Sequence, residues 1–174
     1  MTATATMTGD PEGRPDGASE AAEPRWLSLE EQHAWRGFIY GASAVLEYLS
    51  QVLERDEEIS LTLHEYEILV RLSETERGRM RMSELADQIV HSRSRLTHTV
   101  ARLEKRGLLI RERCSVDGRG REAVLTDEGM ALLERAAPVH VASVREAIVE
   151  PLGSADFVAL GELMRRVRRD DQRP

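Results

Sequence analysis

The sequence predicts a mainly α-helical protein that carries one small β-wing. Over most of its 174 residues, apolar side chains recur at three- and four-residue spacing, which is the period of an α-helix. Two short apolar segments, 108–110 and 123–125, flank a polar turn at 117–120 and predict a single hairpin. Only 4% of the residues are aromatic, so aliphatic side chains must supply most of the packing between the helices.

Composition narrows the class of protein. The hydrophobic share of 41% is ordinary for a folded soluble protein. No apolar run has the length of a membrane-spanning helix or follows a charged start as a signal peptide does, so we expect a soluble, cytoplasmic protein. Cys114 is the one cysteine, which excludes an internal disulfide framework and a Cys-x-x-Cys metal site.

Charge is distributed unevenly along the chain. The net charge is −7, but residues 1–24 carry five acidic residues against one arginine, whereas residues 79–121 carry eleven basic residues against five acidic ones. Exposed charges further apart than a Debye length are largely screened, so a phosphate backbone responds to the local basic segment. The asymmetry favours a nucleic-acid partner, although a basic run is also compatible with an ordinary solvated face.

The N-terminal part predicts a tail and a long helix. Residues 1–24 are rich in Thr, Ala, Gly, Pro and acidic residues without any period, and we expect a disordered acidic tail. A helix follows from Ser28 to about Arg55, with Ser28 as its candidate N-cap and Glu30 and Glu31 at the positive end of its dipole. Its apolar stripe is too long for one short partner, so we expect it to pack along another long helix, in the same chain or in a second one.

The next segment predicts a shorter helix and a strand. Thr62 caps a helix from Leu63 to about Glu74, with Glu65 in the capping-box position. We expect a short strand at 80–82, beside the wing.

Two short helices separated by a tight turn follow. Ser83 and Ser92 stand where N-caps would satisfy the first amides of each helix, and Gly107 provides a left-handed stop. The apolar residues at helical spacing are Leu85, Ala86, Ile89 and Val90 in the first helix and Leu96, Val100 and Leu103 in the second. Helix, turn, helix and hairpin in this order are typical of a winged helix-turn-helix, a module that mainly reads DNA.

The C-terminal part predicts two further helices. Thr126 caps a helix that continues to about Glu150, and Pro138 in its middle predicts a kink or a break. A Pro-Leu-Gly segment ends this helix, and Ser154 opens the last one, which ends in a cluster of arginines.

The combined motifs resemble those of the MarR family of bacterial regulators. They are S-E-L-A-x-x-I before the second helix of the pair, R-L-E-K-R-G-L at its end, and D-x-R followed by V-L-T-x-E-G. The resemblance covers about residues 28–170. It implies a domain of residues 25–174 with a winged helix-turn-helix lobe at about 60–126 and long dimerisation helices at about 28–56 and 127–171.

The resemblance also implies a mode of action. Members of this family form homodimers whose first and last helices interlock, and their recognition helices enter successive major grooves of a pseudo-palindromic operator. Such a dimer usually acts as a repressor that is released when a small, often aromatic or phenolic acid binds between the dimerisation helices and the DNA-binding lobe. We therefore expect double-stranded DNA, a second copy of the chain and a small-molecule effector as partners.

The second helix of the pair offers candidate contacts to DNA. Short hydroxyl and basic side chains on the face opposite its apolar residues can reach base edges. These residues are Arg93, Ser94, Thr97 and His98. Ser92 and the first free amides suit a phosphate, and Arg95 lies further round, toward the DNA backbone. The alternative interpretation of this face is an ordinary solvated surface.

In the wing, Asp117 and Arg119 match the D-x-R motif of the family. A guanidinium at the tip of a thin hairpin can enter the minor groove, where the potential is most negative, and a nearby carboxylate can hold it in place. Arg121 adds a contact to the DNA backbone. The alternative is a flexible turn with an incidental charge pair.

Several residues of the first two long helices lie where related proteins receive ligands. They are Trp26, His33, Trp35, Arg36, Tyr40 and His64. An arginine and a histidine among aromatic rings suit an aromatic carboxylate, so the candidate effector-pocket residues are His33, Arg36, Tyr40 and His64. Packing at a dimer interface explains these residues almost as well.

Other chemistries find little support in the sequence. Cys114 beside Arg113 has the setting of a redox sensor, but a plain strand cysteine is the simpler interpretation. The five histidines show no tight ligand spacing, and we predict neither a metal nor a cofactor. No glycine-rich phosphate loop, nucleophile elbow or catalytic carboxylate pair stands in the sequence, so we expect no enzyme. The remaining alternative is a winged-helix module that binds protein without reading DNA.

Overall fold

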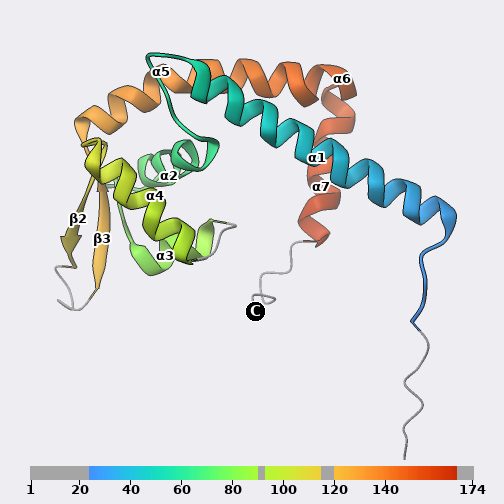
Figure 1. Ribbon diagram of the computed structural model, residues 1–174, viewed down its shortest axis with the longest axis horizontal. Helices are drawn as coiled ribbons and strands as arrows, with labels where there is room; N and C mark the ends of the chain where they lie inside the picture. Colours follow the sequence, from blue (N-terminus) through green and yellow to red (C-terminus); the bar gives the residue numbers. More distant parts are fainter. Residues whose placement is uncertain (1–23, 90–92, 115–119, 168–174) are drawn as a thin grey trace, which may run out of the picture. The chain divides into compact units, whose positions relative to one another are not determined.

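The computed structural model describes residues 24–89, 93–114 and 120–167, and of Arg93 only the backbone. The chain divides at Gly37 into two compact units, and each is described by itself. Helices predominate, and the strands form one three-stranded sheet (Figure 1). This is the predicted fold class, mainly α-helical with a small β-wing.

The first unit contains the start of helix α1 (Leu29–Arg55). Ser28 caps this helix as predicted. The N–H of Glu31 donates to Ser28 Oγ at 3.1 Å, and the N–H of Ser28 donates to the Glu31 carboxylate at 2.7 Å. This reciprocal pair of bonds is a capping box, which satisfies two amides that the helix itself leaves without a partner.

The second unit contains the remaining helices and the whole sheet. After the end of α1 it holds, in chain order, α2 (Leu63–Ser73), β1 (Arg79–Arg81), α3 (Met82–Gln88), α4 (Arg93–Lys105), β2 (Leu109–Arg113), β3 (Arg121–Leu125), α5 (Asp127–Val144), a π-helical turn η1 (Arg145–Val149), α6 (Glu150–Leu152) and α7 (Ser154–Val167). Helices α3 and α4 are the predicted helix pair, and β2 and β3 are the wing.

Helix α2 lies at the centre of this unit, in contact with α4, α5, β1 and β3. Its predicted capping box is present: the N–H of Glu65 donates to Thr62 Oγ1 at 3.2 Å, and the N–H of Thr62 donates to the Glu65 carboxylate at 2.9 Å. Leu69 and Leu72 on its inner face are fully buried. Complete burial of one leucine side chain contributes about 1.5–3 kcal/mol.

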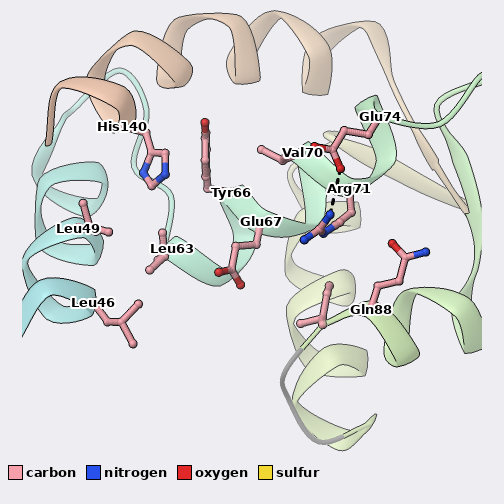
Figure 2. Close-up of a pocket in the computed structure, with 11 residues that line it drawn as sticks. Leu46, Leu49, Leu63, Tyr66, Glu67, Val70, Arg71, Glu74, Gln88 and His140 are labelled. Atoms are coloured by element: carbon pink, nitrogen blue, oxygen red, sulfur yellow. Dashed lines mark hydrogen bonds and ion pairs between the residues drawn. The ribbon is translucent and has the colours of Figure 1, made fainter. Parts of the chain in front are cut away.

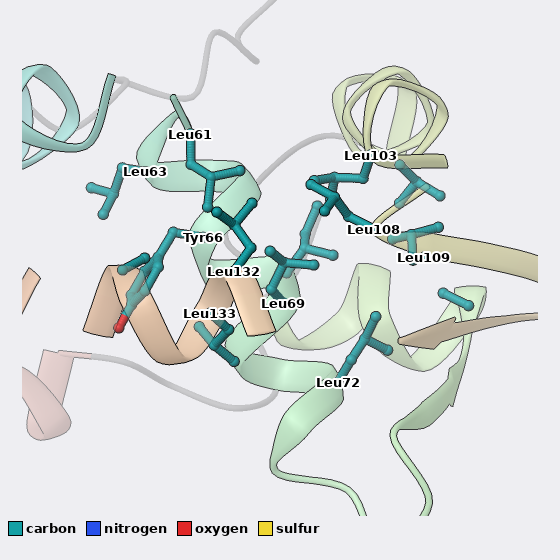
Figure 3. Close-up of a cluster of buried hydrophobic side chains, with 14 of the residues drawn as sticks. Leu61, Leu63, Tyr66, Leu69, Leu72, Leu103, Leu108, Leu109, Leu132 and Leu133 are labelled. Atoms are coloured by element: carbon teal, nitrogen blue, oxygen red, sulfur yellow. The ribbon is translucent and has the colours of Figure 1, made fainter. Parts of the chain in front are cut away.

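The hydrophobic core gathers leucine side chains from several elements around α2 (Figure 3). The side chains labelled there are Leu61, Leu63, Tyr66, Leu69, Leu72, Leu103, Leu108, Leu109, Leu132 and Leu133. Of the apolar residues predicted for the helix pair, Leu85, Ile89, Leu96, Val100 and Leu103 are buried, Ala86 is half-buried, and Val90 lies outside the described residues. The helical period therefore identified the inward faces of α3 and α4 correctly.

Strand β3 lies between β1 and β2 and runs antiparallel to both. Ala123 pairs with Met80 on one side and with Arg111 on the other, and its side chain is fully buried. The sheet thus joins the strand before α3 to the wing and closes one side of the core.

Strands β2 and β3 extend further into the hairpin than the predicted segments 108–110 and 123–125. The additional residues are mainly charged. Arg79 of β1 lies 3.4 Å from the Glu112 carboxylate and 3.5 Å from that of Glu122, so cross-strand ion pairs accompany the extended pairing. An apolar pattern gives no sign of strand residues that are held in this way.

The predicted N-cap of α3 is wrong. Ser83 lies inside the first turn, because the helix begins at Met82 and Arg81 is its N-cap. The Glu84 carboxylate accepts the N–H of Arg81 at 3.4 Å, which is the bond that the third helical residue makes to the N-cap in a capping box. Ser92, the predicted cap of α4, lies outside the described residues.

The junction between the wing and α5 follows the prediction. Gly107 ends α4 with φ of +74°, a left-handed conformation that glycine adopts without strain. Thr126 caps α5: its Oγ1 accepts the N–H of Gly129 at 3.0 Å and donates to Gly107 O at 2.7 Å. One hydroxyl therefore fixes the start of α5 against the end of α4.

Of the kink or break predicted at Pro138, the break is absent. Helix α5 runs through the proline, and its regular α-helical pattern changes only at the π-turn η1. A proline removes one hydrogen bond, but the buried Leu132, Leu133 and Ala136 pack this helix onto the core and hold its course. At η1, Tyr48 Oη of α1 donates to the Glu146 carboxylate at 2.6 Å.

None of the helices in the described part of the chain combines the length and the apolar character that a membrane crossing requires.

A close contact in this fold makes Gly129 sensitive to substitution. A Cβ at this position would fall 2.0 Å from the backbone oxygen of Leu108. We expect Gly129→Ala to lower the free energy of unfolding by about 1–3 kcal/mol, the range for an overpacked core. Urea unfolding measures this decrease, with Ala131→Ser at an exposed position of the same helix expected within about 0.5 kcal/mol of wild type. A Gly129→Ala protein as stable as wild type would contradict the close packing.

Candidate nucleic-acid interface and cavity

Helix α4 presents a polar face to solvent. Leu96, Val100 and Leu103 on one side are buried in the core, whereas Ser94, Thr97 and His98 on the other are exposed, as is Arg95. This division follows directly from the helical period of the apolar residues. Of the other predicted contacts, Ser92 and the side chain of Arg93 lie outside what the structure describes.

Two arginines anchor the C-terminal end of α4. Arg106 donates from Nη1 to Ser60 O at 2.8 Å and from Nη2 to Ile59 O at 3.1 Å, in the loop before α2. Arg111 of β2 donates from Nε to the Glu104 carboxylate at 2.9 Å, and this charged hydrogen bond lowers the pKa of Glu104. The helix is therefore tied to the loop before α2 and to the wing.

A third contact ties α4 to the start of α2. Arg102 Nε lies 3.2 Å from Glu65 Oε1, and the glutamate is almost fully buried. The same glutamate forms the capping box of α2 with Thr62. An almost fully buried carboxylate needs such partners, because burial without them disfavours its charged form.

The wing places two arginines opposite each other. Arg121, a predicted DNA contact, begins β3 and pairs in register with Arg113 at the end of β2. Both residues are exposed, and like charges directly across a strand pair are destabilising unless an anion lies between or beside them. The sequence did not indicate that Arg113 faces Arg121, because this pairing depends on strand register. The predicted Asp117 and Arg119 fall outside the described residues.

The one cysteine is part of this sheet region and is buried. Cys114 follows β2 with 2% of its surface exposed, and its Sγ lies 3.4 Å from Glu122 Oε1. Within the described residues, no three His, Cys, Asp or Glu side chains gather as a metal ion would require.

A cavity of about 330 Å³ lies between the second half of α1, α2, the end of α3 and α5 (Figure 2). Its lining residues are Leu46, Leu49, Leu63, Tyr66, Glu67, Val70, Arg71, Glu74, Gln88, Ile89 and His140. Five of these eleven residues are aliphatic, and Arg71 forms an ion pair with Glu74 at 3.1 Å. The cavity thus combines an apolar wall with a few charged groups, which is the usual composition of a small-molecule site.

His140 is the unusual residue of this cavity. Its ring centroid lies 4.4 Å from that of Tyr66, and its Nδ1 is buried without a hydrogen-bond partner among the residues that the structure describes. Burial lowers the pKa of His140, and the Glu67 carboxylate opposes part of this shift. The lowered pKa favours the neutral imidazole, which leaves Nδ1 as a buried nitrogen without a partner in the described structure.

The four predicted effector residues lie elsewhere. His33 and Arg36 belong to the first unit and are exposed, and Tyr40 is exposed on α1 with 72% of its surface accessible. His64 of α2 lines a separate groove with residues of α4. None of the four is among the residues that line the cavity, and their assignment to an effector stays a prediction. Tyr66 and His140 carried no sequence signal beyond the apolar period, because they meet only in the folded chain.

The buried histidine predicts a pH dependence of stability. Because burial lowers the pKa of His140 below its ordinary value of 6.5, the unfolded chain takes up this proton at a higher pH than the folded protein. The stability that the neutral imidazole of His140 contributes is complete above pH 6.5. It is lost as the pH falls from there toward the pKa of His140 in the folded protein. We expect the stability of wild type to fall more than that of His140→Leu between about pH 7 and about pH 5 in thermal unfolding. Parallel curves for the two proteins would contradict a neutral, buried His140.

Comparison with known proteins gives the relatives of this chain. The model of the MarR family matches residues 61–120. Among curated proteins, the HTH-type transcriptional regulator MhqR of Bacillus subtilis (strain 168) is 29% identical over 91 residues, which are 52% of this chain and 62% of that protein. This chain therefore spans less than two thirds of MhqR.

Solved structures extend the similarity to most of the chain. Sco3205, a MarR family transcriptional regulator from Streptomyces coelicolor in complex with DNA, is 46% identical with a TM-score of 0.78, over 84% of this chain and 90% of that one. AbsC, a MarR family transcriptional regulator from the same organism, is 40% identical with a TM-score of 0.76, over 83% and 95% of the two chains. These relatives are regulators and not enzymes. With this identity over nearly the whole length of a relative, the chain belongs to the MarR family of DNA-binding transcriptional regulators.

Proposed function

We propose that this regulator is a homodimeric repressor that binds a pseudo-palindromic operator and is released by a small-molecule effector. The observation that carries the proposal is the exposed polar face of α4, whose opposite face is buried in the core. A helix fixed on one side and polar on the other can enter a major groove without disturbing the fold. Such a regulator would work in the cytoplasm, where chromosomal operators lie.

In this proposal, α4 reads bases and the wing contacts the backbone and the minor groove. Thr97 and His98 are exposed near the middle of α4 and have side chains that bond to base edges. The predicted contacts Ser92, Arg93, Ser94 and Arg95 precede them in the sequence and are proposed for the same duplex. On the wing, Arg119 and its neighbour Asp117 are proposed for the minor groove, with Arg121 and the facing Arg113 on the phosphates.

Exposed apolar side chains support the homodimer. Single exposed apolar residues are ordinary, but larger groups of them mark surfaces that another molecule covers. They occur on α7, as Val158, Leu163 and Val167, and on α1, as Phe38, Ile39 and Leu46. The proposed division is accordingly an acidic tail at 1–24, dimerisation helices at about 28–56 and 127–171, and the DNA-binding lobe between them.

The cavity supports release by an effector. Its apolar wall suits an aromatic ring, and Arg71 is the cation that could meet an acid group of an aromatic or phenolic carboxylate. The residues that line it come from α1 and α5 on one side and from α2 and α3 on the other. A ligand that binds one relative placement of these helices better than another shifts the population toward it and changes the affinity for DNA.

Dimerisation should fail when the exposed apolar face of α7 is charged. We expect Leu163→Glu to give a monomer or an aggregate in light scattering, because burial of an unpaired carboxylate is unfavourable. Ser83→Glu adds the same charge at an exposed position of α3, outside the proposed dimerisation helices, and should remain dimeric. A stable, well-folded monomer of the wild-type chain would exclude the proposed assembly.

Variants of α4 and a variant of the wing should change DNA binding in different ways. Thr97→Ala and His98→Ala should change base preference, because removal of one good hydrogen bond to a base edge costs roughly 1–3 kcal/mol. Arg119→Ala should instead weaken binding most on operators with AT-rich flanks, because it senses groove width. Gel shifts with DNA from upstream of the protein's own gene, and with single-base variants of the bound site, measure both effects. Wild-type affinity and preference in all three variants would refute this mode of recognition.

A further inference from the structure

A second hollow lies on the side of α4 that faces the start of α2. It is an open groove of about 660 Å³, and it is distinct from the cavity beside His140. Its lining residues are Thr62, His64, Ser94, Arg95, His98, Thr99 and Arg102. Two arginines and two histidines line it, and none of its lining residues is acidic. Positively charged and hydrogen-bond-donating side chains thus line this groove, which suits an anion.

The nearest acidic groups lie behind the groove and do not line it. Glu65 is almost fully buried beneath the groove, where its carboxylate accepts two bonds from Thr62 and pairs with Arg102. Glu67 lies 3.9 Å from His64 Nδ1 and belongs to the wall of the cavity. The first carboxylate positions the guanidinium of Arg102 and is itself removed from solvent.

Arg102 keeps donors for a further partner. A guanidinium has five N–H groups. Among the described residues, its Nε contacts Glu65 and its Nη2 contacts Thr62 Oγ1 at 3.5 Å, while 58% of the side chain is exposed. The remaining N–H groups belong to a planar guanidinium that two partners hold and that lines the groove, and such a group binds phosphate oxygens well.

We infer that this groove holds a phosphate of the DNA backbone, contacted from α2 by His64 and from α4 by Arg102. The inference rests on the proposed function, because it takes α4 as the helix that enters the major groove. Ser94 and His98 belong to both the groove and the polar face of α4, so the two surfaces are continuous. A strand whose bases meet α4 would pass its phosphates along this edge.

The inference gives His64 a different role from the one that the sequence suggests. The sequence makes His64 a candidate for an effector carboxylate, but the residue lines the groove beside α4 and not the cavity. Phosphate contacts carry no sequence information, so a contact from the α2 side of the groove should raise the affinity for every duplex and help to orient the protein on it. The wing and His64 of α2 would then position α4 on the DNA from two sides.

The test uses full-length protein and a mixed-sequence duplex, so no operator needs to be known. Affinity is measured across a salt series for wild type, His64→Arg and His64→Glu. One additional phosphate contact should steepen the dependence of log K on log salt by about 0.9 per subunit in His64→Arg. His64→Glu should bind about tenfold more weakly, since a carboxylate would face the phosphate.

Matched controls separate a local contact from a change in net charge. Ala131→Arg and Ala131→Glu make the same additions at an exposed position of α5 that does not line the groove, and they should follow wild type. Arg102→Gln should flatten the salt dependence by about 0.9 per subunit. The two His64 variants keep the test valid if Arg102→Gln, without its ion pair to Glu65, fails to fold.

The outcomes are distinct. Salt slopes of both His64 variants that match the Ala131 controls would overturn the inference while leaving DNA binding by α4 intact. Inorganic phosphate should weaken the binding of DNA to wild type, but not to His64→Glu, more than chloride of equal ionic strength does, because it competes with the backbone phosphate for the groove; equal effects of the two anions on both proteins would count against the inference. Failure of wild type to bind any duplex at low salt would instead refute the proposed function.

Discussion

Burial of the inner face of α2 is the interaction on which the rest of this structure depends. Leu69 and Leu72 are fully buried there, and α4, α5, β1 and β3 all pack on the same helix. The capping box of Thr62 and Glu65 sets where the helix begins, and Arg102 links the same glutamate to α4. Because a close-packed core transmits a shift instead of absorbing it, a change in the placement of α2 is felt at the recognition helix.

The fold also explains how a chain with a net charge of −7 binds a polyanion. In the DNA-binding lobe, acidic side chains are used internally: Glu104 pairs with Arg111, and Glu112 and Glu122 pair with Arg79. Most of the acidic excess lies outside this segment of the sequence, including the five acidic residues of 1–24. The basic groups of α4 and the wing therefore dominate the local potential, which is what a phosphate backbone experiences at physiological ionic strength.

One helix serves both proposed ligands. The side chains of Tyr66 and Glu67 on α2 line the cavity, while Thr62 and His64 at its start line the groove beside α4. An effector in the cavity and a phosphate in the groove would thus act on the same rigid element from two sides. Coupling between two such sites is reciprocal, so an effector that lowers the affinity for DNA is itself bound more weakly by the DNA-bound protein.

The sequence by itself determined the features that depend on near neighbours. Helical period identified the buried faces of α3 and α4, and hydroxyl residues marked the caps at Thr62 and Thr126, because these signals act over three or four residues. Where packing opposed a local signal, as at Pro138, packing prevailed. The tertiary structure alone decided which distant residues meet: His140 against Tyr66, Arg113 opposite Arg121, and His64 beside α4 and not in the cavity. Such contacts depend on strand register and on how helices pack, and neither is encoded in the period of any single element.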